Sequence, residues 1–217
     1  MAAITLLDGG LGQELVARSG DEPTPLWATR VMLDHPGMVR DIHADYFAAG
    51  ATIATTNTYA IHHDRLENFG LDPLFHALHL KALAEAHEAR AAHGSGRIAG
   101  SMGPLVASYR TDVTQPVDIA TPKYAEIATI LGPHVDMILC ETMASVEMAE
   151  GALAGAQAAG FAEADPTADV EGHDAGDPPE AIRTRLDTFA AGKADGQQIP
   201  MIARNSSDCS SLETRSS

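Results

Sequence analysis

Carboxylates and glycines follow a short apolar run near the start of the chain, in the segment LLDGGLGQEL. Asp8 comes directly after the apolar residues, and Gly9 and Gly10 follow it. Glycine lets a ligand approach the backbone closely, and the neighbouring carboxylate suits a ligand amine. An ordinary strand-to-loop turn also uses Asp-Gly, so this motif alone leaves both interpretations open.

Two later segments also place polar side chains after apolar runs, ATIATTNTYA and ILCETM. Asn57 can donate and accept hydrogen bonds, and Tyr59 offers an aromatic wall with a polar tip. Both residues would equally suit the capping of a strand end. Glu141 ends an apolar run, where a carboxylate needs a partner. That partner is either a ligand ammonium group or the start of the next helix.

Trp27 is the only tryptophan. It is either a hydrophobic anchor for its loop or an aromatic face that attracts a cationic ligand by cation–π interaction.

The histidines do not form a metal-binding motif. His62, His63 and Asp64 are consecutive, and His76 and His79 lie three residues apart, but no spacing matches a template such as His-Glu-x-x-His. We therefore expect solvated histidines and no metal site here. The GGLG segment lacks the spacing and the lysine of a phosphate-binding loop.

Alternating strands and helices must position these residues. The predicted strands are 4–7, 51–58, 97–102 and 135–140, and the predicted helices are 38–49, 74–92, 121–131 and 145–159, the last capped by Ser145. Four such units imply a parallel α/β sheet, either doubly wound or part of a (β/α)8 barrel. Polar residues at the carboxyl ends of successive strands favour the barrel, because those ends meet at one mouth. These residues are Asp8, Asn57, Ser101 and Glu141.

The composition changes after residue 160, where Asp, Gly, Pro and Ser become frequent and aliphatic residues sparse. Only a weak helix is predicted at 180–191, and no fifth apolar strand is expected. We predict two regions, a partial barrel at 1–160 and a divergent, largely disordered tail at 161–217.

Composition narrows the function. A net charge of -16 argues against nucleic acid as a partner. No run of about 18 apolar residues is present, which excludes a membrane span. Two cysteines exclude a disulfide framework, and the N-terminus lacks the pattern of a secretory signal. We therefore expect a cytoplasmic protein whose partners are small molecules or a second copy of itself.

Four segments together resemble the homocysteine S-methyltransferase family, which includes betaine- and S-methylmethionine-dependent enzymes. They are LLDGGLGQEL, PLWATRVMLDHPGMVRDIHADYFAAGATIATTNTYA, GSMGPL and ILCETMASVEMA, in the family's order between residue 4 and about residue 160. The resemblance implies a (β/α)8 barrel of which this chain holds about half. It also implies methyl transfer from an onium or similar donor to the thiol of homocysteine, giving methionine.

The resemblance further implies two sets of binding residues. The homocysteine-binding set is Asp8, Gly9, Gly10, Asn57 and Glu141, with Glu141 on the amino group. The methyl-donor set is Trp27 and Tyr59.

In this family, zinc held by three cysteine thiolates activates the homocysteine thiol. The segments that would carry these cysteines are absent from this chain. Cys140 precedes Glu141, so its side chain should point to the other face of its strand, and Cys209 lies in the tail. We therefore expect no zinc on this chain, although zinc serves the family.

Two alternatives stay open. One is a non-catalytic half-barrel that binds an amino acid or a partner chain and associates with itself through its open sheet edge. The other is an unrelated α/β enzyme with similar strand ends.

Overall fold

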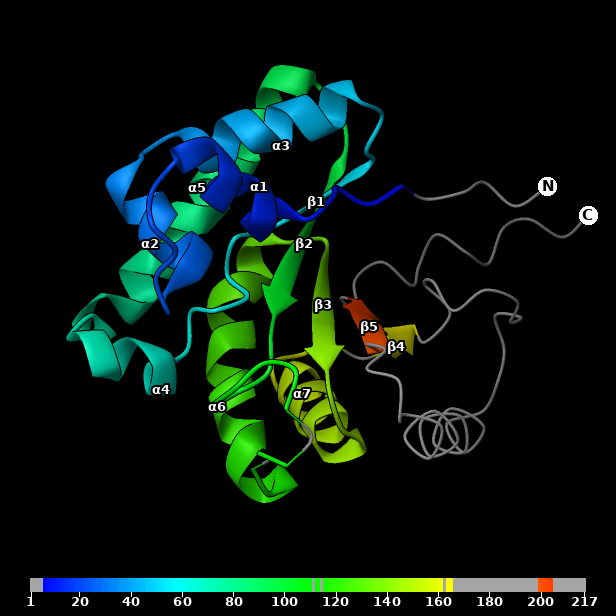
Figure 1. Ribbon diagram of the computed structural model, residues 1–217. Helices are drawn as coiled ribbons and strands as arrows, with labels where there is room; N and C mark the ends of the chain where they lie inside the picture. The colour runs from blue at the N-terminus through cyan, green and yellow to red at the C-terminus, as the bar shows by residue number, and fades with distance from the viewer. Residues whose placement is uncertain (1–5, 111, 114, 162, 166–198, 205–217) are drawn as a thin grey trace, which may run out of the picture.

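The computed structural model describes residues 6–110, 112–113, 115–161, 163–165 and 199–204. Its sheet has five strands in the order β1-β2-β3-β5-β4 (Figure 1). The parallel strands are β1 (Ile53–Thr55), β2 (Arg97–Met102) and β3 (Met137–Met143). The antiparallel strands are β4 (Glu163–Asp165) and β5 (Ile199–Arg204).

Helices connect the parallel strands and pack on one face of the sheet (Figure 1). The α-helices are α1 (Leu11–Ser19), α2 (Trp27–Asp34), α3 (Met38–Ala48), α4 (His63–Leu66), α5 (Phe75–His93), α6 (Val117–Leu131) and α7 (Val146–Ala158). The 3-10 helices are η1 (Glu67–Phe69), η2 (Asp72–Leu74) and η3 (Gly132–His134). Among the described residues, no helix is long and apolar enough to cross a membrane.

Strand alternation divides the core between the two faces of the sheet. Ile138 and Cys140 join the large cluster that the helices cover. Met137 and Leu139 pack on the opposite face with Ile53. Cys140 therefore points away from the face that carries its neighbour Glu141, as strand alternation predicts.

The first predicted strand continues the parallel sheet beside β1. Leu7 forms a parallel bridge with Ile53, and the Asp8 amide donates to the Ile53 carbonyl at 3.0 Å. Residues 4 and 5 lie outside the described part. Four parallel segments joined by helices on one face confirm the prediction of a partial (β/α)8 barrel.

Two predicted boundaries are wrong. The strand predicted at 51–58 ends at Thr55, because the Thr58 amide turns back to the Thr56 carbonyl at 2.7 Å. Helix α6 begins at Val117 rather than Thr121, and Pro122 lies inside it. Proline costs a helical hydrogen bond, but the buried face that includes Tyr124 packs on α7, and this contact outweighs the loss.

The expectation that no strand follows residue 160 is also wrong. The apolar run 199–203 supplies most of β5, which pairs antiparallel with β3, and β4 pairs with β5. β5 therefore occupies the edge of β3 that lies opposite to β2. The helix predicted at 180–191 and Cys209 lie outside the described residues.

Candidate functional site

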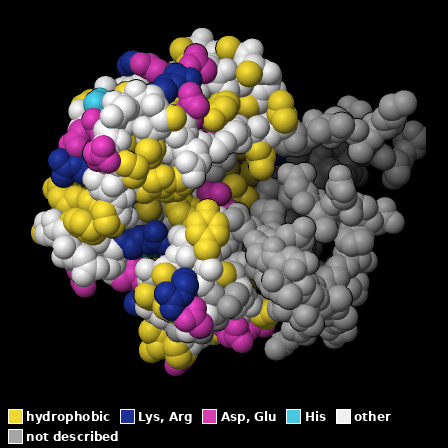
Figure 2. All heavy atoms as spheres, in the orientation of Figure 1, with side chains coloured by type: hydrophobic (Ala, Val, Ile, Leu, Met, Phe, Trp, Pro, Cys, Tyr) yellow, Lys and Arg dark blue, Asp and Glu magenta, His cyan; other side chains and the backbone are white. Residues whose placement is uncertain are grey.

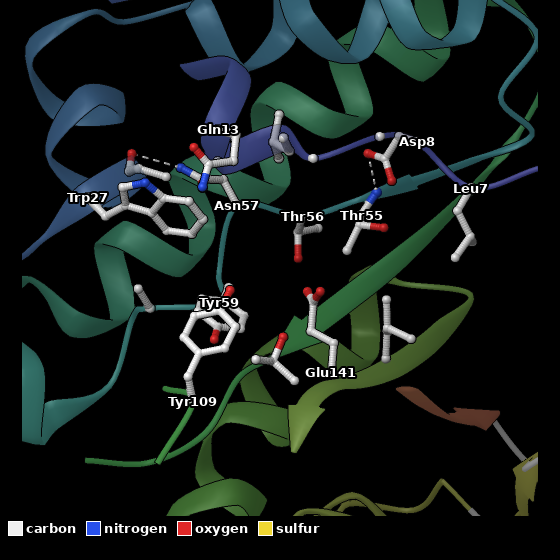
Figure 3. Close-up of a pocket in the computed structure, with 18 residues that line it drawn as sticks. Leu7, Asp8, Gln13, Trp27, Thr55, Thr56, Asn57, Tyr59, Tyr109 and Glu141 are labelled. Carbon is white, nitrogen blue, oxygen red and sulfur yellow. Dashed lines mark hydrogen bonds between the residues drawn. The ribbon is translucent and has the colours of Figure 1, made fainter. Parts of the chain in front are cut away.

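A cavity of about 270 Å³ lies at the carboxyl ends of the parallel strands (Figure 3). All seven residues selected from the sequence line it, namely Asp8, Gly9, Gly10, Trp27, Asn57, Tyr59 and Glu141. Their roles in binding stay predictions. Sequence reasoning missed several other lining residues, among them Gln13, Thr55, Thr56, Tyr109 and Thr142.

Asp8 is held rigidly by the backbone of β1. Its side chain is 1% exposed, and Oδ2 accepts a hydrogen bond from the Thr55 amide at 2.8 Å. The same oxygen lies 3.3 Å from Nδ1 of His43, which α3 contributes. Oδ1 has no hydrogen-bond partner among the described residues. Asp8 therefore has one oxygen engaged by the protein and one unpaired.

Glu141 lies near the carboxyl end of β3, and Figure 3 shows its carboxylate pointing into the cavity. It accepts a hydrogen bond from the Ser101 hydroxyl of the neighbouring strand β2. Burial raises the pKa of Glu141, and the charge of Asp8 raises it further, whereas the Ser101 hydrogen bond opposes both. A ligand cation would offset the cost of this buried charge.

Glu141 does not cap the helix that follows it. The N-cap of α7 is Ser145, whose Oγ accepts from the Met148 amide at 3.2 Å. The sequence-based capping assignment for Ser145 is confirmed, and the alternative use of Glu141 as a cap is wrong.

Trp27 and Tyr59 form an aromatic corner of the cavity. Their ring centroids are 6.1 Å apart, and the planes meet at 73°. The Tyr59 hydroxyl donates to Ser108 at 2.7 Å, and the Arg65 guanidinium lies 5.7 Å from the Tyr59 ring centroid. Burial raises the pKa of Tyr59, so this residue stays a neutral phenol near neutral pH.

Asn57 lies in the loop after β1 and connects that loop to α2. Its amide nitrogen donates to the Ala28 carbonyl at 3.1 Å, and its side chain is buried. This contact holds the first turn of α2, and with it Trp27, against the end of β1. Asn57 thus shapes the cavity through at least one structural hydrogen bond.

Backbone strain concentrates around the cavity. Four described non-glycine residues have positive φ angles, and three of them line the cavity: Trp27 (47°), Tyr109 (62°) and Thr142 (63°). Such conformations cost about 1–3 kcal/mol each and cluster at ligand sites. Positive φ angles are a property of the backbone and not of the side chains, and they support the same location for the site.

The cavity is acidic. Among the described residues that line it, Asp8 and Glu141 are the charged ones, and none is Lys, Arg or His. Two carboxylates beside two aromatic rings favour a cationic group over an anion. On the face in Figure 2, acidic and basic side chains are interspersed among the described residues, without a continuous basic patch.

The prediction of solvated histidines is wrong for His62 and His79. Both are buried, and burial lowers the pKa of His62 to about 3 and that of His79 to about 4. His62 contacts the Tyr59 carbonyl, and His79 contacts the Phe75 carbonyl. His62 precedes α4 and His79 lies within α5, and both side chains are buried. The local spacing of histidines does not reveal this burial.

The described residues do not contain the three-cysteine zinc site that the sequence resemblance implies. They contain no group of three or more His, Cys, Asp or Glu side chains that could hold a metal ion. Cys140 is buried against the helices. Burial raises its pKa to about 12, with a further contribution from the charge of Glu141. Cys140 is therefore a protonated thiol that faces away from the cavity.

Fold and cavity together define the class of protein. This is a barrel-type α/β protein with a cavity lined by two carboxylates and several aromatic rings at the carboxyl ends of its parallel strands. Residues 5–191 match the family model described as homocysteine S-methyltransferase. The chain belongs to the homocysteine S-methyltransferase family.

Known relatives agree with this assignment. The homocysteine S-methyltransferase of Escherichia coli K12 is 32% identical over 155 residues, which make up 64% of this chain and 50% of the relative. Homocysteine S-methyltransferase 3 of Zea mays is 44% identical over 54 residues, 25% of this chain and 16% of the relative. The chain thus spans about half the length of its E. coli relative.

A solved structure shares the fold. It is the homocysteine methyltransferase MmuM from Escherichia coli in its metallated form, which superposes with a TM-score of 0.64 at 28% identity. The match covers 72% of this chain and 61% of that chain.

Proposed function

We propose that the cavity binds homocysteine as the methyl acceptor of an S-methyltransferase reaction. The observation that carries this proposal is the pair of carboxylates, Asp8 and Glu141, in one cavity whose described lining residues include no basic side chain. In a chain of this family, such a pair suits the ammonium group of an amino acid.

Each part of the cavity has a role in this proposal. Glu141 binds the homocysteine ammonium group, and Asp8 adds a second negative charge beside it. Gly9 and Gly10 let the ligand approach the backbone. Trp27 holds the onium methyl donor by cation–π attraction, which Tyr59 supports.

The reaction itself moves one methyl group. The homocysteine sulfur attacks the methyl carbon of the onium donor, the new carbon–sulfur bond forms, and the bond to the donor breaks with its electron pair. The thiol proton goes to solvent, and the products are methionine and the demethylated donor, which no longer carries the onium charge. The described residues contain no cluster that could hold a metal ion, so we propose that their contribution is to bind homocysteine and the donor.

A non-catalytic amino-acid-binding half-barrel is the second candidate. The observation in its favour is the burial of Cys140 away from the cavity, together with the presence of only one further cysteine in the chain. Both candidates require ligand binding, and they differ in whether methionine forms.

Calorimetric titration of L-homocysteine into the full chain tests the binding step. We expect saturable binding that Glu141→Gln weakens at least tenfold, consistent with the loss of a charged hydrogen bond. Asp136→Asn is the matched control, because it removes a carboxylate directly before β3, at the end of the strand opposite to Glu141. The absence of homocysteine binding to the wild-type chain would refute the proposed function.

Methionine formation separates the two candidates. The full chain is incubated with homocysteine, zinc and either S-methylmethionine or betaine, and methionine is quantified by mass spectrometry. Turnover above the Glu141→Gln background favours the enzyme, and binding without turnover favours the half-barrel.

A further inference from the structure

His43 lies against Asp8 from outside the cavity. It belongs to α3, its side chain is 0% exposed, and its Nδ1 is 3.3 Å from Asp8 Oδ2. His43 is not one of the residues that line the cavity. It can therefore act on a ligand only through Asp8.

Three polar atoms of this pair lack hydrogen bonds. The 3.3 Å contact does not have hydrogen-bond geometry, so both ring nitrogens of His43 are without a hydrogen-bond partner among the described residues, as is Asp8 Oδ1. Buried polar groups are nearly always paired, and leaving one unpaired costs about 1–3 kcal/mol. This cost suggests that Asp8 Oδ1 and His43 Nδ1 gain hydrogen bonds in another state of the protein.

Ligand binding supplies such a state. An ammonium group at Oδ1 would pull on a carboxylate whose only hydrogen bond comes from the Thr55 amide at Oδ2. A second donor on Oδ2 would fix the plane of the carboxylate against that pull. Hydrogen bonds around active groups are often long without ligand and shorten in the complex.

We propose that His43 is a positioning residue that donates from Nδ1–H to Asp8 Oδ2 and thereby holds Oδ1 for the ligand ammonium group. This inference rests on the proposed function, since it assigns Asp8 to a cationic ligand. The Thr55 amide already donates to the same oxygen, so His43 would be the second donor on Oδ2.

Two substitutions of His43 test the role in the full chain. In His43→Asn the side-chain amide replaces Nδ1 as a donor, whereas His43→Leu has no donor. We expect the Kd for homocysteine to rise about tenfold in His43→Leu and to return most of the way in His43→Asn. Equal affinity of His43→Leu and the wild-type chain would overturn the inference.

A buried histidine elsewhere provides the matched control. His79 of α5 is also fully buried and also has an unpaired ring nitrogen, but its other ring nitrogen contacts the Phe75 carbonyl rather than Asp8. His79→Leu should change stability and leave the Kd of the folded protein unchanged. If both leucine variants weaken binding equally, His43 contributes only to folding and the inference is wrong.

The nitrogen resonances of the His43 ring show which ring nitrogen carries the proton in the ligand-free chain. We expect the proton on Nδ1, the atom 3.3 Å from Asp8 Oδ2, because donation to Asp8 requires it there. An Nδ1 that carries no proton would overturn the inference. If homocysteine fails to bind the wild-type chain, the proposed function fails, while this spectrum still decides whether Nδ1 has the proton that donation to Asp8 requires.

Discussion

Gly12 lies directly against the ring of Trp27. A Cβ atom at Gly12 would be 2.6 Å from Cη2 of that ring, closer than packed carbon atoms approach one another. The absence of a side chain at Gly12 is therefore what allows Trp27 to reach its position in the cavity wall.

Gly12→Ala should displace the Trp27 ring and cost about 1–3 kcal/mol of stability through overpacking. Trp27 is the only tryptophan, so its fluorescence emission reports the displacement directly. Gly10→Ala is the control, since a Cβ there would come no closer than 3.8 Å to another side chain. Identical emission spectra for the two variants would show that the aromatic corner does not depend on Gly12.

Glu141→Gln should stabilise the folded protein at pH 7 while it weakens homocysteine binding. The folded-state pKa of Glu141 is raised, so the folded state binds the proton more tightly than the unfolded state does. Stability from this group is present at low pH and is lost as pH rises through the raised pKa. Removing the charge removes that loss.

Thermal unfolding at pH 7 and pH 4 measures this effect. We expect the melting temperature of Glu141→Gln to exceed that of the wild-type chain by a few degrees at pH 7, with a smaller difference at pH 4. A variant that melts below the wild-type chain at pH 7 would mean that the Ser101 contact outweighs the cost of the buried charge.

His79 should make the protein sensitive to acid. Burial lowers its pKa from 6.5 to about 4, so the unfolded state binds more protons between these values. Stability is complete above pH 6.5 and falls as pH decreases toward 4, by an amount of about 3 kcal/mol for this group. His79→Leu should flatten this dependence. His76→Leu should not, because His76 lies on the same helix but is exposed. Chemical denaturation at several pH values between 4 and 7 measures the slopes.

Cys140 should be unreactive and the chain should not retain zinc. Burial raises the pKa of Cys140 to about 12, and the thiolate is the reactive and metal-binding form. In Cys209→Ser, a thiol reagent should label no cysteine in the native chain and one after unfolding. Elemental analysis of the wild-type chain after dialysis should find well below one zinc per chain. One equivalent of zinc, retained in wild type and lost in Cys140→Ser, would contradict this prediction.

Local sequence patterns determined the parallel sheet and the seven cavity residues that we selected. Apolar runs followed by polar residues mark the carboxyl ends of strands, and parallel strands bring those ends to one edge. Asp8 and Glu141 could therefore be placed together although they lie far apart in the chain. Alternation along one strand also predicted that Cys140 faces away from Glu141.

Only the tertiary structure decided the remaining features. The contact of His43 with Asp8, the fit of Trp27 against Gly12 and the pairing of β5 with β3 each join distant segments. Burial of a histidine depends on which helix face meets the sheet, and strand pairing depends on which edge is free. Neither is encoded in the spacing of neighbouring residues, because both depend on contacts that exist only after the chain has folded.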